Sequence, residues 1–211
     1  MRKKMIFIFT TMALFLTQAC MYQPRETLPP ANVEIWVRQS VDELAKSATD
    51  VIRAEVLDSR EEQINTILGG STHGSQFVKP HLVYRLRVIE VFKGDTEVGD
   101  IVEIMQEKVQ TDNIGTGHVR QLSIAIGADL VFFLRSFESQ GSEHLPMAIE
   151  GGSQGVYRTP SSIVDNDSVR SIKETIDEDP SISDVTLSSL DTFNNMILTI
   201  GDLMRISGDS K

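Results

Sequence analysis

The feature that most limits how this chain can fold is a series of short apolar segments separated by turn signals. In Leu82–Phe92, apolar and polar residues alternate, which is the pattern of a half-buried strand. Its predicted buried face consists of Leu82, Tyr84, Leu86, Val88 and Phe92. Arg85 and Arg87 fall on the opposite face, where arginine side chains are normally solvated. The continuous apolar run Leu130–Leu134 instead predicts a strand buried on both faces.

Further strand patterns flank these two segments. Val51–Leu57 alternates, so Ile52, Ala54 and Val56 are expected on a buried face and Arg53 and Glu55 on a polar one. Ile101–Gln106 contains β-branched residues, and Met147–Glu150 and Gln154–Arg158 flank a glycine turn. Strands at this spacing predict a small all-β barrel or sandwich. The chain has no regular βαβ alternation, which argues against a Rossmann-type sheet.

Two helices are expected beside the strands. Ser40–Glu43 reads as a capping box, followed by an apolar helical face that ends near Asp50. Near the C-terminus, Leu187, Leu190, Phe193, Ile197 and Ile200 fall close to helical spacing. Ser188 with Asp191 would cap this second helix, and Gly201 would end it. We expect it to pack on the barrel.

Two polar stretches are predicted to be irregular. Residues 58–80 read as a long excursion, in which Glu61–Leu68 is a candidate helical turn. Pro160–Ser183 is acidic and is expected to be a solvated loop. A calcium site there is the alternative, although its oxygens lack the EF-hand spacing and glycine.

The N-terminus has the pattern of an export signal. Arg2, Lys3 and Lys4 precede the twelve-residue, largely apolar run Met5–Leu16. A membrane-spanning helix needs about 20 residues, so this run is too short to span and matches a signal-peptide core. An uncut N-terminal anchor helix is the alternative.

Cys20 follows this run directly and is the only cysteine of the chain. The segment Leu16–Cys20 resembles a bacterial lipobox, in which the cysteine is acylated and becomes the first residue of the mature protein. Ala19 fits that pattern, whereas Thr17 stands where leucine is usual. Ordinary cleavage near Ala19, with a free thiol, is the alternative. A lone cysteine also rules out an intrachain disulfide or a Cys-rich zinc site.

The predicted organisation has four parts. Residues 1–19 form the signal peptide, 20–32 a lipid-anchored tether with three prolines, 33–160 the β-barrel domain, and 161–211 the acidic loop and C-terminal helix. Trp36, the only tryptophan, is expected to pack at the start of the domain, an exposed contact being the alternative. The formal net charge of −10 argues against a nucleic-acid partner.

The order of these elements resembles exported bacterial proteins with a barrel of the tissue-inhibitor-of-metalloproteinases type, an OB-fold relative. The resemblance covers about Ser40 to Arg158 and is carried by Asp50–Val56, Val91–Asp95, Gly99–Val102, Gly127–Leu134 and Gly151–Tyr157. It implies a mainly β, small OB-like barrel with a short N-terminal helix. Protease inhibition does not carry over, because the family's disulfides are impossible here and Cys20 is expected to be acylated.

Catalytic patterns are weak. Gly151–Gly155 matches G-x-S-x-G around Ser153, but the residues after it read as extended and all four histidines precede the serine. A hairpin turn that needs glycine at positive φ explains the motif better. His73, His81, His118 and His144 show no metal-binding spacing. Gly69–Gly74 is neither a dinucleotide fingerprint nor a P-loop, and Arg85, Arg87 and Arg120 are a candidate basic patch.

The sequence therefore favours a non-enzymatic, lipid-anchored exported protein that acts as a binding or envelope-associated module. Its expected partners are membrane lipid, through acylated Cys20, and an extracytoplasmic protein or envelope ligand that the sequence does not name. No cofactor, metal or catalytic residue is predicted. The alternative is an exported metal-dependent hydrolase, with a site assembled from His118, His144 and nearby acids.

Overall fold

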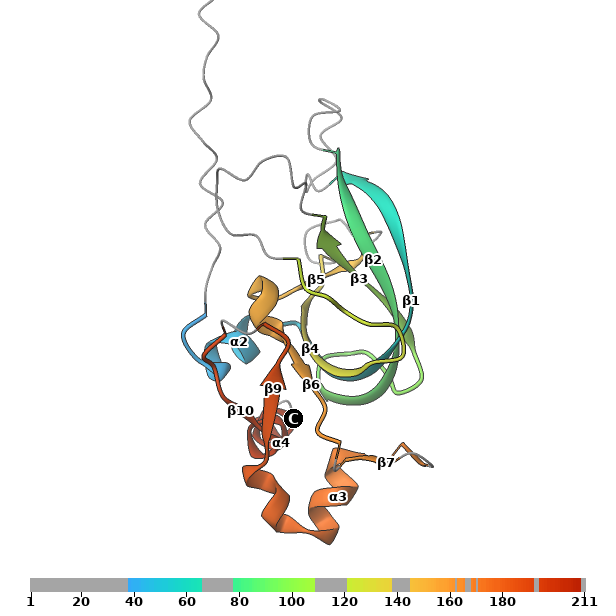
Figure 1. Cartoon of the computed structure of the whole chain (residues 1–211). Coiled ribbons are helices and arrows are strands. Elements are labelled where there is room, and N and C mark those ends of the chain that lie inside the picture. The colour runs from blue at the N-terminus through green and yellow to red at the C-terminus, as the bar shows by residue number, and fades with distance from the viewer. Residues whose placement is uncertain are drawn as a thin grey trace, which may run out of the picture. The chain divides into compact units, whose positions relative to one another are not determined.

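The computed structural model describes residues 38–65, 78–108, 121–137, 145–161, 163–165, 168–169, 171–191 and 194–209. All of them lie in the unit Ile35–Lys211 (Figure 1). The strands are β1 (Asp50–Asn65), β2 (Val78–Lys93), β3 (Ile101–Glu107), β4 (Asp129–Arg135), β5 (Met147–Ile149), β6 (Val156–Arg158), β7 (Val164–Asp165), β8 (Ser168–Val169), β9 (Thr186–Ser189) and β10 (Leu198–Thr199). The helices are α2 (Val41–Ser47), α3 (Ile172–Glu178) and α4 (Ile200–Asp209), with 3₁₀ turns η3 (Gly152–Gly155) and η4 (Pro180–Asp184).

Five strands form a ring. β1 pairs antiparallel with both β2 and β4, β2 pairs with β3, β3 pairs parallel with β5, and β5 pairs with β4. The order β1-β2-β3-β5-β4 therefore returns to β1, which confirms the predicted mainly β, OB-like barrel. β6, β9 and β10 extend the sheet outward from β4.

The barrel interior is filled mainly by alternate residues of β1, β2 and β4, together with residues of β3, of β6 and of the segment before β4. This cluster comprises Ile52, Ala54, Val56, Tyr84, Leu86, Val88, Ile104, Leu122, Ile124, Leu130, Phe132, Leu134 and Val156. The residues between them on β4, Val131 and Phe133, belong to a second cluster outside the barrel. The prediction that the apolar run 130–134 is buried on both faces is thus confirmed.

The three helices lie together on one side of the barrel and cover the second cluster (Figure 1). It is formed by Leu44, Ala45, Ala48, Val51, Phe92, Val131, Phe133, Tyr157, Ile163, Ile172, Leu187, Leu198, Ile200, Leu203 and Ile206. The predicted N-terminal helix is confirmed as α2, since Ser40 Oγ accepts a hydrogen bond from the Glu43 N–H at 3.2 Å. Residues beyond 160 supply nearly half of this cluster, so they are integral to the fold.

The predicted excursion over residues 58–80 is wrong at both ends. β1 continues to Asn65 and β2 begins at Val78, so Glu61–Asn65 is strand and not a helical turn. These strand ends are polar because they pair by charge. Arg60 makes a bidentate bond to Glu103, at 2.6 and 2.8 Å, and Lys79 contacts Glu107 at 2.7 Å. Main-chain hydrogen bonds and ion pairs between strands stabilise these ends. The alternating apolar pattern by which a strand is recognised in a sequence is therefore missing here.

A bulge corrects the predicted face of β2. Arg53 pairs with Glu90, but Ala54 pairs with Val88, so Ile89 is an extra residue in the ladder. An extra residue turns the following side chains to the other face. Phe92 therefore packs in the helix-covered cluster and not with Leu86 and Val88 inside the barrel.

The C-terminal helix exists but begins where it was predicted to end. Leu187 lies on β9 and faces Leu198 on β10, and α4 follows from Ile200. The capping box is Thr199 with Asp202 and not Ser188 with Asp191. Asp202 Oδ2 accepts from the Thr199 N–H at 3.0 Å, and Thr199 Oγ1 accepts from the Asp202 N–H at 3.1 Å. Both bonds satisfy amide groups that a helix start leaves open.

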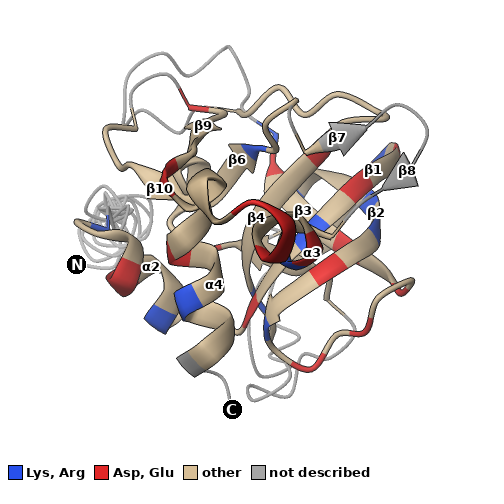
Figure 2. Ribbon diagram, turned by 90° about the horizontal axis from the view of Figure 1, so that it is seen from below, with Lys and Arg blue, Asp and Glu red and all other residues tan. Residues whose placement is uncertain are grey.

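The acidic stretch Pro160–Ser183 is also not simply a loop. It contains the β7–β8 hairpin, α3 and most of η4. Ile172 of α3 is fully buried, whereas the acidic residues of α3 lie on its outer side (Figure 2). The stretch reads as polar because a short helix with one buried anchor exposes most of its side chains.

Asp202 makes the stability depend on pH. Burial acts to raise the pKa of Asp202, but hydrogen bonds from Thr199 and Arg205 outweigh it and hold that pKa below its usual range. A carboxyl group with a lowered folded-state pKa stabilises the fold above its unfolded-state pKa of about 3.9. That stabilisation is lost as pH falls through the folded-state pKa. We expect Asp202→Ala to lower the unfolding free energy by about 1 kcal/mol at pH 7.

Thermal unfolding of both proteins from pH 7 to pH 3 checks this expectation, because the difference should shrink below about pH 4. Asp177→Ala, at an exposed position of α3, should match the wild type throughout. A gap between Asp202→Ala and the wild type that stays constant down to pH 3 would contradict the role given to the carboxylate.

Candidate functional site

The chain is held firmly where the described part begins, at Arg38. The side chain of Gln154 on η3 bonds the Arg38 main chain twice: Oε1 accepts from the N–H at 2.8 Å, and Nε2 donates to the carbonyl at 3.2 Å. The Arg38 guanidinium donates to Glu150 Oε1 from Nε at 3.1 Å and from Nη2 at 2.5 Å. We call Arg38, Glu150 and Gln154 the Arg38 clamp. It fixes both the position and the direction of the chain at this point.

Glycines shape the loop that carries the clamp. Gly151 and Gly152 have φ values of 64° and 62°, in the left-handed region that favours glycine. This confirms the expected need for positive φ. The loop is not a hairpin turn, however, because β5 and β6 do not pair with each other but follow one another along the same edge of β4: Ile149 pairs with Leu134 and Val156 with Phe132, while β1 occupies the other edge. It bulges out from this edge of β4 between β5 and β6, and it carries the Gln154 side chain that bonds Arg38.

The geometry around Ser153 does not form a hydrolase elbow. Ser153 lies in η3 and is followed by the strand β6, whereas an elbow places the serine between a strand and a helix. Its hydroxyl donates to Asp191 Oδ2 at 2.5 Å. Within the described ranges the one histidine is His81, which is buried on β2 with Nδ1 2.9 Å from the Lys79 carbonyl oxygen. Ser153 thus has the environment of a serine that ties η3 to the segment after β9.

A groove of about 710 Å³ lies beside the Arg38 clamp. Its walls are formed by Arg38, Gln39, Ser40, Val41, Asp42, Gln154, Asn194, Asn195, Met196, Ile197, Asp202 and Arg205. Three charged residues of the lining are paired with one another, since Arg205 Nη2 lies 2.6 Å from Asp42 Oδ1 and 3.2 Å from Asp202 Oδ1. Ile197, in contrast, is 68% exposed. The groove therefore combines a neutralised polar wall with an apolar one.

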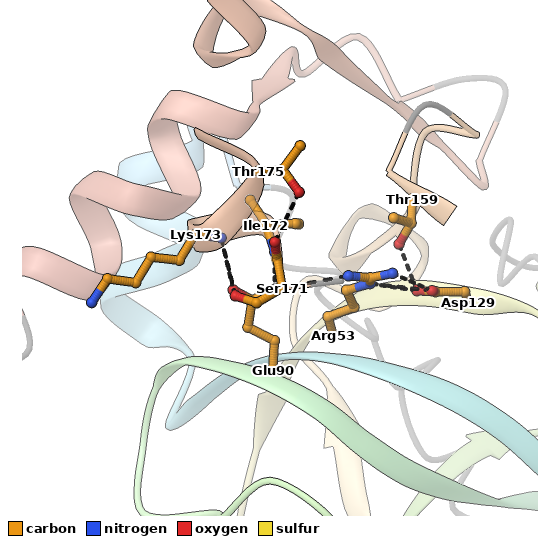
Figure 3. Close-up of polar contacts among 8 residues, drawn as sticks. All are labelled: Arg53, Glu90, Asp129, Thr159, Ser171, Ile172, Lys173 and Thr175. Carbon is orange, nitrogen blue, oxygen red and sulfur yellow. Dashed lines mark hydrogen bonds and ion pairs between the residues drawn. The ribbon is translucent and has the colours of Figure 1, made fainter. Parts of the chain in front are cut away.

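A charged cluster is buried between the barrel and α3 (Figure 3). Arg53 of β1 is fully buried, and its Nε and Nη2 donate to the Asp129 carboxylate of β4 at 2.9 and 2.6 Å. Arg53 Nη1 lies 3.9 Å from Glu90 Oε2. Thr159 Oγ1 donates to Asp129 Oδ1 at 2.8 Å. Charge-assisted bonds of this kind compensate for the burial of the guanidinium.

Glu90 links this cluster to α3. Its carboxylate accepts from the Ser171 hydroxyl at 2.6 Å, from the Ile172 N–H at 2.8 Å and from the Lys173 N–H at 3.2 Å (Figure 3). The two N–H groups belong to the first turn of α3, where main-chain donors have no partner within the helix. A carboxylate at this end of a helix stabilises it. The cluster Arg53–Glu90–Asp129 therefore fastens the C-terminal part of the chain to the barrel, and its groups are committed to one another.

Most residues singled out in the sequence lie outside the described part. Cys20, Trp36, His73, His118, His144 and Arg120 all fall there. Arg85 and Arg87 are described and lie on β2, Arg85 half-buried and Arg87 exposed, but each is paired. Arg85 Nη1 lies 2.9 Å from Asp58 Oδ2, and Arg87 contacts Glu55. These two arginines are thus neutralised by acids of β1 and make no basic patch by themselves.

Sequence reasoning missed the buried cluster and the clamp. The alternation of Arg53 with Ile52 and Ala54 predicts a polar face for it, yet the Arg53 side chain is completely buried. The available signal was the apolar neighbour Val51 on the same face of β1, together with Asp129 directly before the apolar run of β4. Gln154 lies within the literal G-x-S-x-G match, a pattern that points to the serine as the functional residue and carries no signal for the glutamine.

Known protein-family models and curated proteins were both compared with the chain, and neither comparison gives a match. Among the described residues, no helix is long and apolar enough to cross a membrane. Within the same ranges, no three His, Cys, Asp or Glu side chains gather in a way that would hold a metal ion.

Proposed function

We propose that this protein is a lipid-anchored module on the outer side of a bacterial membrane, and that it acts by binding an extracytoplasmic protein or envelope ligand. It resembles exported bacterial lipoproteins with a barrel of the tissue-inhibitor-of-metalloproteinases type. In this proposal Cys20 carries the acyl chains, and the segment after it is a tether. Two or more acyl chains hold a protein stably on a membrane surface.

The Arg38 clamp is the observation that carries the proposal. A tether orients a folded domain only if the chain leaves that domain at a fixed point. Gln154 and Glu150 hold both the main chain and the side chain of Arg38, eighteen residues beyond Cys20. A surface salt bridge alone contributes little, but Glu150 is only 3% exposed, which strengthens its bond to Arg38. A fixed position of Arg38 would let an anchor at Cys20 hold the folded domain through one defined point.

The environments of the chemically reactive side chains support binding over catalysis. Ser153 donates to Asp191, and the carboxylates of Glu90, Asp129 and Glu150 accept bonds from structural partners. A general base or a nucleophile must lie within hydrogen-bonding reach of the substrate group on which it acts. These groups are instead aimed at the protein's own helices and loops.

The anchoring part of the proposal is tested by Cys20→Ser. The wild type should be found in the membrane fraction and should take up labelled palmitate, whereas Cys20→Ser should be released and unlabelled. The physical reason is that the acyl chains supply the membrane affinity, at about 0.8 kcal/mol per buried CH₂. Cell fractionation with palmitate labelling measures both effects.

Gln23→Ser, three residues further along the tether, is the matched control and should behave as the wild type. Retention of Cys20→Ser in the membrane, together with a wild type that takes up no palmitate, would show that Cys20 is not the anchor.

A further inference from the structure

The groove beside the Arg38 clamp has apolar residues in its lining. Met196 and Ile197 line it, and Ile197 is the second most exposed of the large apolar residues in the described part, at 68%. Arg38 lines the same groove. The residues directly before Arg38 are therefore the nearest candidates to cover this wall.

We propose that Ile35–Val37, the three residues that precede the clamp, dock in this groove, with the Trp36 side chain against Met196 and Ile197. The proposal concerns the folded body alone and holds whether or not Cys20 is acylated. It commits to this chain's own segment as the occupant.

The short distance along the chain between Trp36 and Arg38 supports this assignment. Consecutive Cα atoms lie 3.8 Å apart, so the Cα of Trp36 is at most about 7 Å from that of Arg38. The Arg38 N–H, through which the chain continues to Val37, is bonded to Gln154, and Gln154 is itself a wall of the groove. Asn194 stands next to it, since its Nδ2 donates to the Gln154 carbonyl at 3.2 Å. The clamp thus fixes Arg38, from which the proposed docking segment extends, at the groove.

The chemistry of the segment also fits. Ile35, Trp36 and Val37 are three consecutive apolar residues between Glu34 and Arg38. Three exposed apolar residues in a row are unfavourable in water, and burial of an aromatic side chain stabilises by a few kcal/mol. Because Arg205, which also lines the groove, is already paired with Asp42 and Asp202, the groove suits an uncharged occupant better than a charged ligand.

Docking would shorten the free tether. The tether would then be Met21–Glu34, fourteen residues, which span at most about 50 Å when extended. This limit on the distance between the folded body and a bilayer is the one part of the inference that rests on the proposed function. The docking itself does not.

Trp36 is the only tryptophan, so its fluorescence reports directly on the groove. The experiment uses the purified full chain with Cys20→Ser, whose behaviour does not depend on acylation. Trp36 emission should be shifted to shorter wavelength relative to the chain unfolded in urea, and acrylamide should quench it several-fold less. Ile197→Asp should restore quenching to near the unfolded value, because a carboxylate would then face the indole.

Ile126→Asp is the matched control, since Ile126 is 63% exposed and lies outside the groove. It should leave the fluorescence unchanged, and far-UV circular dichroism should show both variants folded. Gln154→Ala, which removes the main-chain bonds to Arg38, should also raise quenching. Equal quenching of Trp36 in the folded and unfolded chain would overturn the proposal. So would protection that disappears on dilution, which would assign the groove to a second copy, or protection that Ile197→Asp leaves unchanged.

Discussion

Replacing Arg53 by alanine should lower the unfolding free energy by about 3–5 kcal/mol, the usual result of removing one partner of a buried ion pair. The Asp129 carboxylate would keep the hydrogen bond from Thr159 but would lose the bonds from Nε and Nη2 of Arg53. For a folded unit of this size, the loss corresponds to a melting temperature lower by about 6–20 °C. Thermal unfolding at pH 7 measures it.

Arg85→Ala is the matched control for Arg53→Ala. Both residues are strand arginines paired with an aspartate, but the Arg85 side chain is 44% exposed and its pair should contribute at most about 1 kcal/mol. The double variant Arg53→Met with Asp129→Asn should recover much of the lost stability, because it removes the unpaired charge. If Arg53→Ala and Arg85→Ala prove equally mild, the cluster does not fasten the C-terminal part to the barrel.

Gly155→Ala should be the most damaging change in the loop that carries the Arg38 clamp. A Cβ at this position would lie 2.4 Å from the Glu150 carbonyl oxygen and 3.2 Å from that of Phe133. Both obstacles are main chain, which cannot move aside cheaply. Overpacking of this kind costs about 1–3 kcal/mol and sometimes more. We expect a loss near the upper end, about 3 kcal/mol, measured by chemical unfolding.

Gly152→Ala separates this steric effect from backbone conformation. Gly152 has a φ of 62°, but nothing lies within 4 Å of its added Cβ. Alanine there should therefore cost only the left-handed backbone penalty, about 1–2 kcal/mol. Should Gly152→Ala prove the more damaging of the two, the close approach of η3 to the end of β4 is not what requires Gly155.

These changes bear on the proposed function because the loop connects the clamp with the barrel. A displaced η3 would move Gln154 away from Arg38 and loosen the point at which the chain leaves the folded body. Gly155→Ala, where it still folds, should thus also expose Trp36 if Ile35–Val37 dock in the groove. The same loop contains Ser153, so these variants test a structural reason for the glycines in a motif that otherwise suggests a hydrolase.

Local patterns were enough to predict several parts of the molecule. The continuous apolar run of β4 indicated a strand buried on both faces, and the structure places Phe132 inside the barrel and Phe133 under the helices. Ser40 and Glu43 indicated the start of α2, because a capping box depends on residues three apart. The mainly β, barrel-like class followed from the spacing of the strands. The signal and anchor assignments concern residues outside the described part and stay predictions.

Tertiary structure decided what depends on partners distant in the chain. Arg53 alternates like a solvated residue and is buried only because Asp129 and Glu90, 76 and 37 positions away, are brought to it. Leu187 and Leu198 are compatible with a helix, but pairing between β9 and β10 makes them strand residues. The reason is the same in both cases. Periodicity reports which face of an element is apolar, whereas the burial of a charge and the pairing of a strand are settled by groups that only the folded chain places side by side.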